Sequence, residues 1–357
     1  MSGILILRLN IMTTIIKKLN FGCMLLLAAM TQSAFAKPPP EMVYNLKGSI
    51  VKIHTTTQSG GRGTGSGFVV AENLVATNCH VLSNATGVAI TSRGESFAPV
   101  ALKADWKHDV CVLRFEYLQL QPATLAASDE LHYGADTFSV GFSGGSPKPL
   151  TTVGKIKALY AYDDGYVIRT SASFLMGASG SPLLNEKGEV IGMNTFKSPG
   201  SKGYYYNVPV KWIKAAMTLP ETEKIVQTDT PFWDAPLEQR PYWMQVVLPL
   251  QAEKWDELLN VAKAWYQATP SDPEAQYYLA LAEQNLGLAE QNQQKIQSAK
   301  TKFEQVLKLQ PEHTPSLLAL AQMAQTQGNQ PEFKNLSQQL SVLDEDAFES
   351  LNDSAQQ

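Results

Sequence analysis

Short β-rich runs, separated by Gly, Ser, Asn and Pro, follow one another from Ile50 to about Val210. They lie at 49–54, 67–70, 73–77, 88–91, 110–115, 137–140, 166–170, 190–193 and 204–208. Because no helical stretch separates them, the pattern predicts an antiparallel barrel or sandwich. About a dozen strands in roughly 170 residues suit two packed barrels better than one small sandwich. Asn185-Glu-Lys-Gly188 predicts a hairpin turn, since glycine tolerates positive φ.

The sequence pattern changes after Gln251, where Ala, Leu, Gln, Glu and Lys recur at helical spacing. Helix starts at 271–274 and 314–316 lead us to expect four to six amphipathic helices. Residues 221–250 contain several prolines in an irregular aromatic stretch, which is typical of a connection. The sequence thus predicts an all-β domain at 37–218, a linker at 219–250 and an all-α domain at 251–350.

The helical segment contains a weak internal repeat. Leu279-Ala-Leu-Ala282 precedes Gly287, and Leu318-Ala-Leu-Ala321 precedes Gly328. Small residues where helices cross and glycine at a helix end favour stacked helix hairpins. The segment resembles tetratricopeptide repeats, which implies a surface for a protein partner, although residues 291–298 would then be an insertion. An ordinary helical bundle with alanine in its core remains the alternative.

The N-terminus has the order of a secretory signal peptide. Arg8, Lys17 and Lys18 precede an apolar run at 21–30, and Ala34-Phe-Ala36 ends the segment. The run is too short for a transmembrane helix, so we expect removal of residues 1–36 after Ala36 and no stable membrane anchor in the mature chain. This predicts a periplasmic or secreted protein.

The charge balance argues against nucleic acid as a partner. The chain has 29 basic and 33 acidic residues, a formal net charge of −4. Residues 37–220 have a net charge of +4 and residues 221–357 one of −11. Nucleic-acid binding usually needs a basic field, which is absent, and the asymmetry supports two separate units.

Three polar residues of the strand-rich half stand in the order His, Asp, Ser. His80 follows a predicted strand, Asp109 precedes another, and Ser179 lies in the glycine-rich turn Gly177-Ala-Ser-Gly180. A serine hydroxyl is a poor nucleophile at neutral pH, and it needs an imidazole to take its proton and a carboxylate to orient that imidazole. Glycines in the turn would leave backbone N–H groups free to bind an oxyanion.

Five segments together resemble the trypsin-like serine proteases, most closely the HtrA/Deg type. They are Gly65-Ser-Gly-Phe-Val-Val70, Thr77-Asn-Cys-His80, Asp109-Val-Cys-Val-Leu113, Arg169-Thr-Ser-Ala172 and Gly177-Ala-Ser-Gly-Ser-Pro-Leu183. The resemblance implies a double β-barrel, hydrolysis of peptide bonds in protein or peptide substrates through an acyl-enzyme, and no cofactor. It makes Ser179 the nucleophile, His80 the general base and Asp109 the orienting carboxylate. Backbone N–H groups of Gly177 and Ser179 would form the oxyanion hole.

The chain departs from that family in two respects. Ala178 and Ser181 stand where the family often has Asn and Gly, and a helical segment replaces the usual PDZ domains. The α/β-hydrolase pattern is not met, because position 181 is Ser and the only later histidine is His313. The glycine-rich stretch 59–67 is expected to be a structural turn. No histidine has a partner at metal spacing, so we expect no metal.

Two cysteines remain after signal removal. Cys79 adjoins the expected base and Cys111 lies two positions after the expected orienting carboxylate, so a real triad would make them neighbours. A Cys79–Cys111 disulfide is therefore expected in an oxidising compartment. Two buried free thiols remain the alternative.

The sequence leaves three functions open. A serine endopeptidase whose helical domain holds a partner or substrate is the first. A non-catalytic peptide-binding or assembly scaffold is the second, and a processing enzyme docked to one partner is the third. By resemblance, residues 174–176 and 204–207 would line the primary specificity pocket, and their apolarity predicts a small or apolar residue before the cleaved bond.

Overall fold

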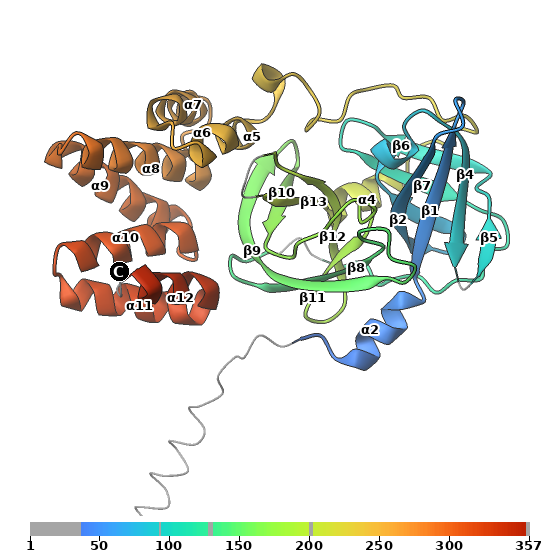
Figure 1. Cartoon of the computed structure of the whole chain (residues 1–357), viewed down its shortest axis with the longest axis horizontal. Helices are drawn as coiled ribbons and strands as arrows, with labels where there is room; N and C mark the ends of the chain where they lie inside the picture. Colours follow the sequence, from blue (N-terminus) through green and yellow to red (C-terminus); the bar gives the residue numbers. More distant parts are fainter. Residues whose placement is uncertain (1–36, 93, 128–130, 200–202, 355–357) are drawn as a thin grey trace, which may run out of the picture. The chain divides into compact units, whose positions relative to one another are not determined.

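The computed structural model describes residues 37–92, 94–127, 131–199 and 203–354. The expected signal peptide, residues 1–36, lies outside this range. The described chain starts with helix α2 (Pro40–Lys47), continues through strands β1–β13, and ends in helices (Figure 1). None of the described helices is both long and apolar enough to cross a bilayer.

A seven-stranded antiparallel sheet forms the first β unit, with the order β5-β4-β1-β2-β3-β7-β6. Its strands are β1 (Ile50–Thr57), β2 (Arg62–Ala71), β3 (Leu74–Thr77), β4 (Ala85–Ser92), β5 (Glu95–Phe97), β6 (Ala101–Asp105) and β7 (Val110–Arg114). The expected two-part β architecture followed by helices is confirmed, and the strand ladders close the second unit into a barrel while the first remains a sheet. The connector, residues 217–254, covers the outer edge of β6 through an isolated bridge between Leu102 and Thr222.

The second β unit is a closed barrel with the order β10-β13-β12-β11-β8-β9. Its strands are β8 (Asp136–Gly141), β9 (Leu150–Tyr162), β10 (Gly165–Thr170), β11 (Pro182–Asn185), β12 (Val190–Lys197) and β13 (Tyr205–Pro209). The predicted turn at 185–188 joins β11 to β12, and Gly188 has a φ of +78°. Helix α4 (Val210–Ala216) follows the barrel and buries Trp212 and Ile213.

The glycine-rich stretch 59–67 is not the simple turn expected from the sequence. Residues 59–60 turn the chain, and Arg62 already begins β2. Glycine is needed within this strand because a Cβ at Gly65 would come within 2.5 Å of a Val81 methyl carbon. Gly65 therefore lets β2 pack directly against helix α3 (Cys79–Leu82), which contains His80.

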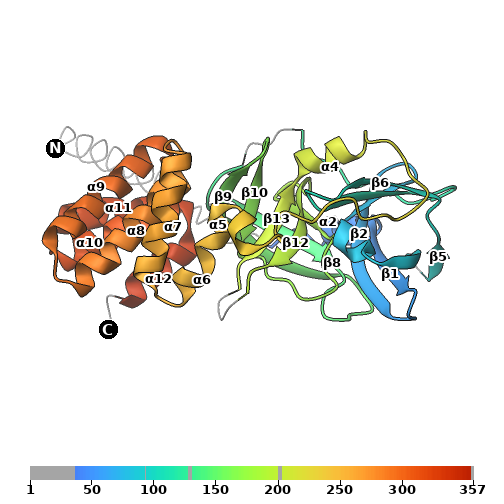
Figure 2. The same cartoon turned by 90° about the horizontal axis from the view of Figure 1, so that it is seen from above.

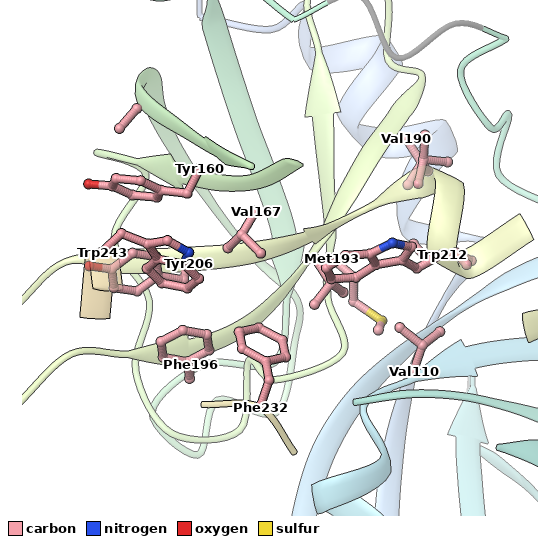
Figure 3. Packing of buried hydrophobic residues seen from close by; sticks show 14 of the residues in the cluster. Val110, Tyr160, Val167, Val190, Met193, Phe196, Tyr206, Trp212, Phe232 and Trp243 are labelled. Carbon is pink, nitrogen blue, oxygen red and sulfur yellow. The ribbon is translucent and has the colours of Figure 1, made fainter. Parts of the chain in front are cut away.

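The connector runs from α4 to the helical part with little regular structure. It contains the short helices η1 (Leu237–Gln239), α5 (Tyr242–Gln245) and α6 (Val247–Gln251). Phe232 and Trp243 are buried and contact Phe196 of β12, as Figure 3 shows, and Trp243 stacks on Tyr160 of β9 at 4.9 Å between ring centroids. The connector is thus packed into the core of the barrel.

Within the described residues, six helices follow the connector, which is the upper end of the expected four to six. They are α7 (Trp255–Ala268), α8 (Pro273–Ala289), α9 (Gln293–Leu309), α10 (Thr314–Thr326), α11 (Gln330–Leu343) and α12 (Glu345–Ser354), and they run alongside one another (Figure 2). The Gln-rich residues 291–298 lead into α9, which begins at Gln293. Gly287 of α8 allows the close approach of α9, since a Cβ there would lie 2.9 Å from Ile296.

Candidate active site

His80 is placed by the strand and the disulfide that precede it. Helix α3 starts directly after β3, and Thr77 of β3 is paired with Cys111 of β7. Cys79 is bonded to Cys111, the pairing expected from the sequence. The bond fixes the start of α3 to the strand that follows Asp109, so the two expected triad members rest on one covalent frame.

Asp109 occupies the turn before β7 with an unusual backbone. Its φ is +60°, a left-handed conformation that few residues other than glycine adopt and that Asp tolerates best. Its carbonyl oxygen accepts hydrogen bonds from Asn78 Nδ2 at 2.9 Å and from the Cys79 N–H at 3.4 Å. These bonds hold the turn so that the carboxylate, whose side chain is fully buried, faces α3.

The Asp109 carboxylate binds His80 at two points. Oδ1 accepts the backbone N–H of His80 at 2.8 Å, and Oδ2 accepts Nδ1–H of its ring at 2.6 Å. A carboxylate oxygen only accepts when ionised, so this contact places the ring proton on Nδ1 and leaves the lone pair on Nε2. The pair can therefore receive a proton at Nε2.

The electrostatics of His80 favour its protonated form. Burial by itself lowers the pKa of His80, but the charge and hydrogen bond of Asp109, with a smaller contribution from the charge of Asp234, outweigh it. The pKa of His80 is therefore raised above its ordinary value of 6.5. An imidazolium formed by proton uptake would be stabilised in place.

Ser179 lies in a loop, residues 174–181, that two glycines make possible. Gly177 and Gly180 have φ of +94° and +88°. A Cβ at Gly180 would come within 2.0 Å of the Ser66 carbonyl oxygen, and one at Gly177 within 2.6 Å of the Phe142 carbonyl oxygen. Only glycine combines these backbone angles with such close contacts.

The backbone around Ser179 leaves two donors free. Ala178 and Gly180 donate their N–H groups to the carbonyl oxygens of Leu175 and Asn194. Within the described residues, the N–H groups of Gly177 and Ser179 have no acceptor. This is the pair that the sequence assigned to an oxyanion hole, and both are half-buried at the surface of the site.

The Ser179 hydroxyl makes one hydrogen bond, donating to the Thr195 carbonyl oxygen at 3.4 Å. Thr195 in turn accepts from Asn78 Nδ2 at 3.2 Å, and the same amide nitrogen binds the Asp109 carbonyl oxygen. The Ser179 loop and the Asp109 turn thus share one hydrogen-bond network. Within the described residues, no hydrogen bond joins the Ser179 hydroxyl to His80, and bonds between a nucleophile and its base are often long or poorly aligned before substrate binds.

Ser66 of β2 holds the Ser179 loop, a role that sequence reasoning missed. Its N–H donates to the Ser179 carbonyl oxygen at 2.8 Å, and its hydroxyl donates to the Gly177 carbonyl oxygen at 2.7 Å. The hydroxyl also accepts the N–H of Phe142 at 2.9 Å. Ser66 belongs to the segment 65–70 that resembles the family, but its role depends on a contact with Gly177, more than a hundred positions away.

The two departures from the family pattern fit the loop. Ala178 is buried, and Ser181 is fully buried beside Gly141 of β8. A Cβ at Gly141 would overlap the Ser181 hydroxyl, so the glycine makes room for the larger residue. Neither substitution involves the free N–H groups.

The residues expected to line a specificity pocket fall into two groups. Leu175 and Met176, beside Gly177, are 63% and 89% exposed, whereas Tyr206 and Asn207 are buried. Phe174 and Tyr205 contact each other at 5.2 Å between ring centroids. Leu175 and Met176 thus expose apolar surface close to Ser179 along the chain.

The part of the chain that the structure describes contains no group of three or more His, Cys, Asp and Glu residues able to hold a metal ion. His108 binds Asp105 and Asp163, at 2.7 Å and 2.9 Å, and His132 binds Glu312. These contacts pair each histidine with carboxylates.

Comparison with known proteins agrees with the geometry. Residues 65–193 match the family model of the trypsin-like peptidase domain. A probable periplasmic DegP-like serine endoprotease of Chlamydia muridarum is 35% identical over 147 residues, which are 39% of this chain and 29% of the relative. The putative serine protease HhoB of Synechocystis sp. is 34% identical over 160 residues, which are 42% of this chain and 38% of the relative.

Among solved structures, the active form of the Rv3671c protease from M. tuberculosis covers 53% of this chain and 92% of its own, with a TM-score of 0.47 and 23% identity. The chain spans well under half the length of the two curated relatives. The strand-rich part is thus similar to trypsin-like peptidase domains over residues 65–193, and helices follow it. Over that domain the chain is similar to HtrA/DegP-type serine proteases.

Proposed function

We propose that this protein is a serine endopeptidase that uses Ser179, His80 and Asp109. The observation that carries the proposal is the buried Asp109 carboxylate holding His80 by two hydrogen bonds, with Nε2 left to accept a proton. The free N–H groups of Gly177 and Ser179 support it further. This combination is what nucleophilic catalysis of acyl transfer requires.

In the first half of the reaction, Ser179 Oγ attacks the peptide carbonyl carbon while its proton passes to His80 Nε2. The carbonyl oxygen becomes an oxyanion and accepts hydrogen bonds from Gly177 and Ser179. Asp109 stabilises the imidazolium. The C–N bond then breaks, His80 gives its proton to the leaving amine, and an ester to Ser179 remains.

In the second half, water attacks the ester carbonyl carbon and gives a proton to His80 Nε2. The second oxyanion binds the same two N–H groups. Its collapse breaks the bond to Ser179 Oγ, which regains the proton from His80 and releases a carboxylic acid. No cofactor takes part in either half.

The substrate and the compartment follow from the surroundings of the site. The exposed Leu175 and Met176 favour protein segments with a small or apolar residue before the cleaved bond. The Cys79–Cys111 bond suits an oxidising compartment, so we propose a periplasmic or secreted location. The helical domain would bind a substrate or a protein partner.

The test is cleavage of an unstructured protein by the chain without residues 1–36, compared with Ser179→Ala and His80→Ala. We expect wild-type cleavage after small or apolar residues and none in either variant. Cleavage after Lys or Arg would overturn the specificity. A folded wild-type chain that binds the substrate without cleaving it would support the scaffold function instead.

A further inference from the structure

The indole of Trp233 reaches the candidate site from the connector. Its Nε1–H donates a hydrogen bond to Asp109 Oδ2 at 3.0 Å. The ring also meets His80 edge-on, at 5.3 Å between centroids and 85° between planes. The ring also stacks on Phe196 of β12, at 5.4 Å between centroids and 18° between planes. Trp233 therefore contacts both His80 and Asp109.

The neighbours of Trp233 hold it in this position. Phe232 is 4% exposed, and its N–H donates to the Lys107 carbonyl oxygen at 3.0 Å. Lys107 lies two positions before Asp109, so the connector is tied to the same turn that presents the carboxylate. The N–H of Asp234 closes a turn onto the Pro231 carbonyl oxygen at 2.8 Å. Trp233 is thus flanked by anchored residues.

The contacts of Trp233 suit a role in orientation. An indole N–H only donates and stays neutral, so it takes no part in proton transfer. It adds a third hydrogen bond to a carboxylate that already binds the backbone and ring N–H groups of His80. Hydrogen bonds to a charged acceptor are stronger than neutral ones, so this bond fixes the carboxylate plane. The ring edge restricts rotation of the imidazole.

We propose that Trp233 is a positioning residue for His80 and Asp109, supplied by the segment that joins the strand-rich and helical parts. Its catalytic consequence rests on the proposed function. The role itself, the orientation of the His–Asp pair, is a property of the folded chain. Loss of the indole N–H should slow the chemical step more than it weakens substrate binding.

The test compares Trp233→Phe, which keeps an aromatic ring without the N–H, with Trp265→Phe as a matched control. Trp265 Nε1 also donates to an aspartate, Asp272 Oδ2, at 3.2 Å, but in the helical part. For Trp233→Phe we expect kcat to fall about tenfold with KM within about twofold. Trp265→Phe should leave both unchanged. A loss confined to KM, or equal behaviour of the two variants, would overturn the proposal.

The pH profile gives a readout that mere destabilisation does not move. Asp109 and Asp234 are the charged groups that act on His80, and Trp233 competes with His80 for Asp109 Oδ2. Without the indole N–H, the carboxylate interacts more fully with the imidazolium, so the acid limb of kcat/KM should move up by some tenths of a pH unit. An unchanged limb would contradict the proposal. Benzothienylalanine at position 233, which lacks only the N–H, repeats the test if the Phe variant folds poorly.

A titration of the His80 ring by NMR in the Ser179→Ala background separates the two proposals. We expect Trp233→Phe to raise the pKa of His80 there, whether or not the wild-type chain cleaves anything. If it does and the wild type is inactive, the positioning role stands and the endopeptidase proposal falls. If the wild type is active and His80 titrates identically with and without the indole, the positioning role is wrong.

Discussion

Two histidine–aspartate clusters meet at the turn before β7, where His108 and Asp109 are adjacent, and they differ chiefly in the burial of their carboxylates. The His80 cluster uses Asp109, whose side chain is fully buried. The His108 cluster uses Asp105 and Asp163, whose side chains are 25% and 35% exposed. In both, the carboxylates outweigh burial of the imidazole and raise its pKa. Charge pairing alone therefore does not distinguish a catalytic pair from an ion pair.

The surroundings of the second ring nitrogen do distinguish them. In His108, Nδ1 and Nε2 are both bound to carboxylates, so neither is available to a substrate or nucleophile. In His80, only Nδ1 is bound to a carboxylate, and Nε2 has no hydrogen-bond partner within the described residues. The comparison leads us to expect chemistry at one cluster and structural pairing at the other.

The difference between the two clusters is tested most strongly by removing one carboxylate charge from each. We expect Asp109→Asn to lower kcat/KM about 10⁴-fold, because an amide favours the wrong tautomer of His80. The matched change Asp105→Asn should leave kcat/KM within about threefold, since exposed pairs contribute little. Steady-state hydrolysis of one peptide by both variants decides. Similar losses in both would mean that the distinction drawn from burial is wrong.

The disulfide offers the next largest effect, since it braces only the His80 cluster. Cys79 and Cys111 enclose a loop with a sequence separation of 32. The chain-entropy relation gives about 3 to 4 kcal/mol of stabilisation for such a loop. Urea unfolding of the double Cys→Ala variant should show a free energy of unfolding lower by that amount. An unchanged midpoint would show that the bond does not stabilise the fold.

The pH dependence of catalysis provides a third test. His80 must be neutral to accept the proton of Ser179, and its pKa is raised above 6.5. We therefore expect kcat/KM to be low in acid and to increase with pH through an apparent pKa above 6.5. Rates of peptide hydrolysis from pH 5 to 9 measure this increase and its apparent pKa. An apparent pKa below 6.5 would contradict the assigned balance between burial and Asp109.

The smallest effect concerns stability at the His108 cluster. Because the folded pKa of His108 is raised, its contribution is complete below the unfolded pKa of 6.5 and is lost as pH rises through the folded value. His108→Asn should lower stability at pH 5 by no more than about 1 kcal/mol and by less at pH 9. Unfolding at both pH values measures the difference. A larger loss of stability at pH 9 than at pH 5 would contradict a raised pKa of His108.

Sequence reasoning could predict the parts of the site that local motifs carry. The motifs around His80, Asp109 and Ser179 each lie within a few neighbouring residues, and the cysteine pairing followed from the expectation that His80 and Asp109 meet. The strand pattern predicted the all-β half, but it missed all of β9, where Lys155 and Lys157 interrupt the apolar run. That strand follows from pairing with β8 and β10, which periodicity does not reveal.

Contacts between distant segments could not be predicted. Trp233 lies 124 positions from Asp109, in a stretch that reads as a proline-rich linker. Gly65 seemed to belong to a turn, since its close contact with Val81 exists only once α3 is packed on β2. The tetratricopeptide character of the helices stays a prediction, because six packed helices are compatible with it but do not define it.

The most direct test of the account is labelling of the chain without residues 1–36 by a fluorescent fluorophosphonate, with the site of attachment read by mass spectrometry. We expect one adduct on Ser179, no labelling of Ser179→Ala or His80→Ala, slow labelling of Asp109→Asn and normal labelling of Asp105→Asn. A folded wild-type chain that does not label, or that labels elsewhere, would contradict the claim that the His80 cluster activates Ser179.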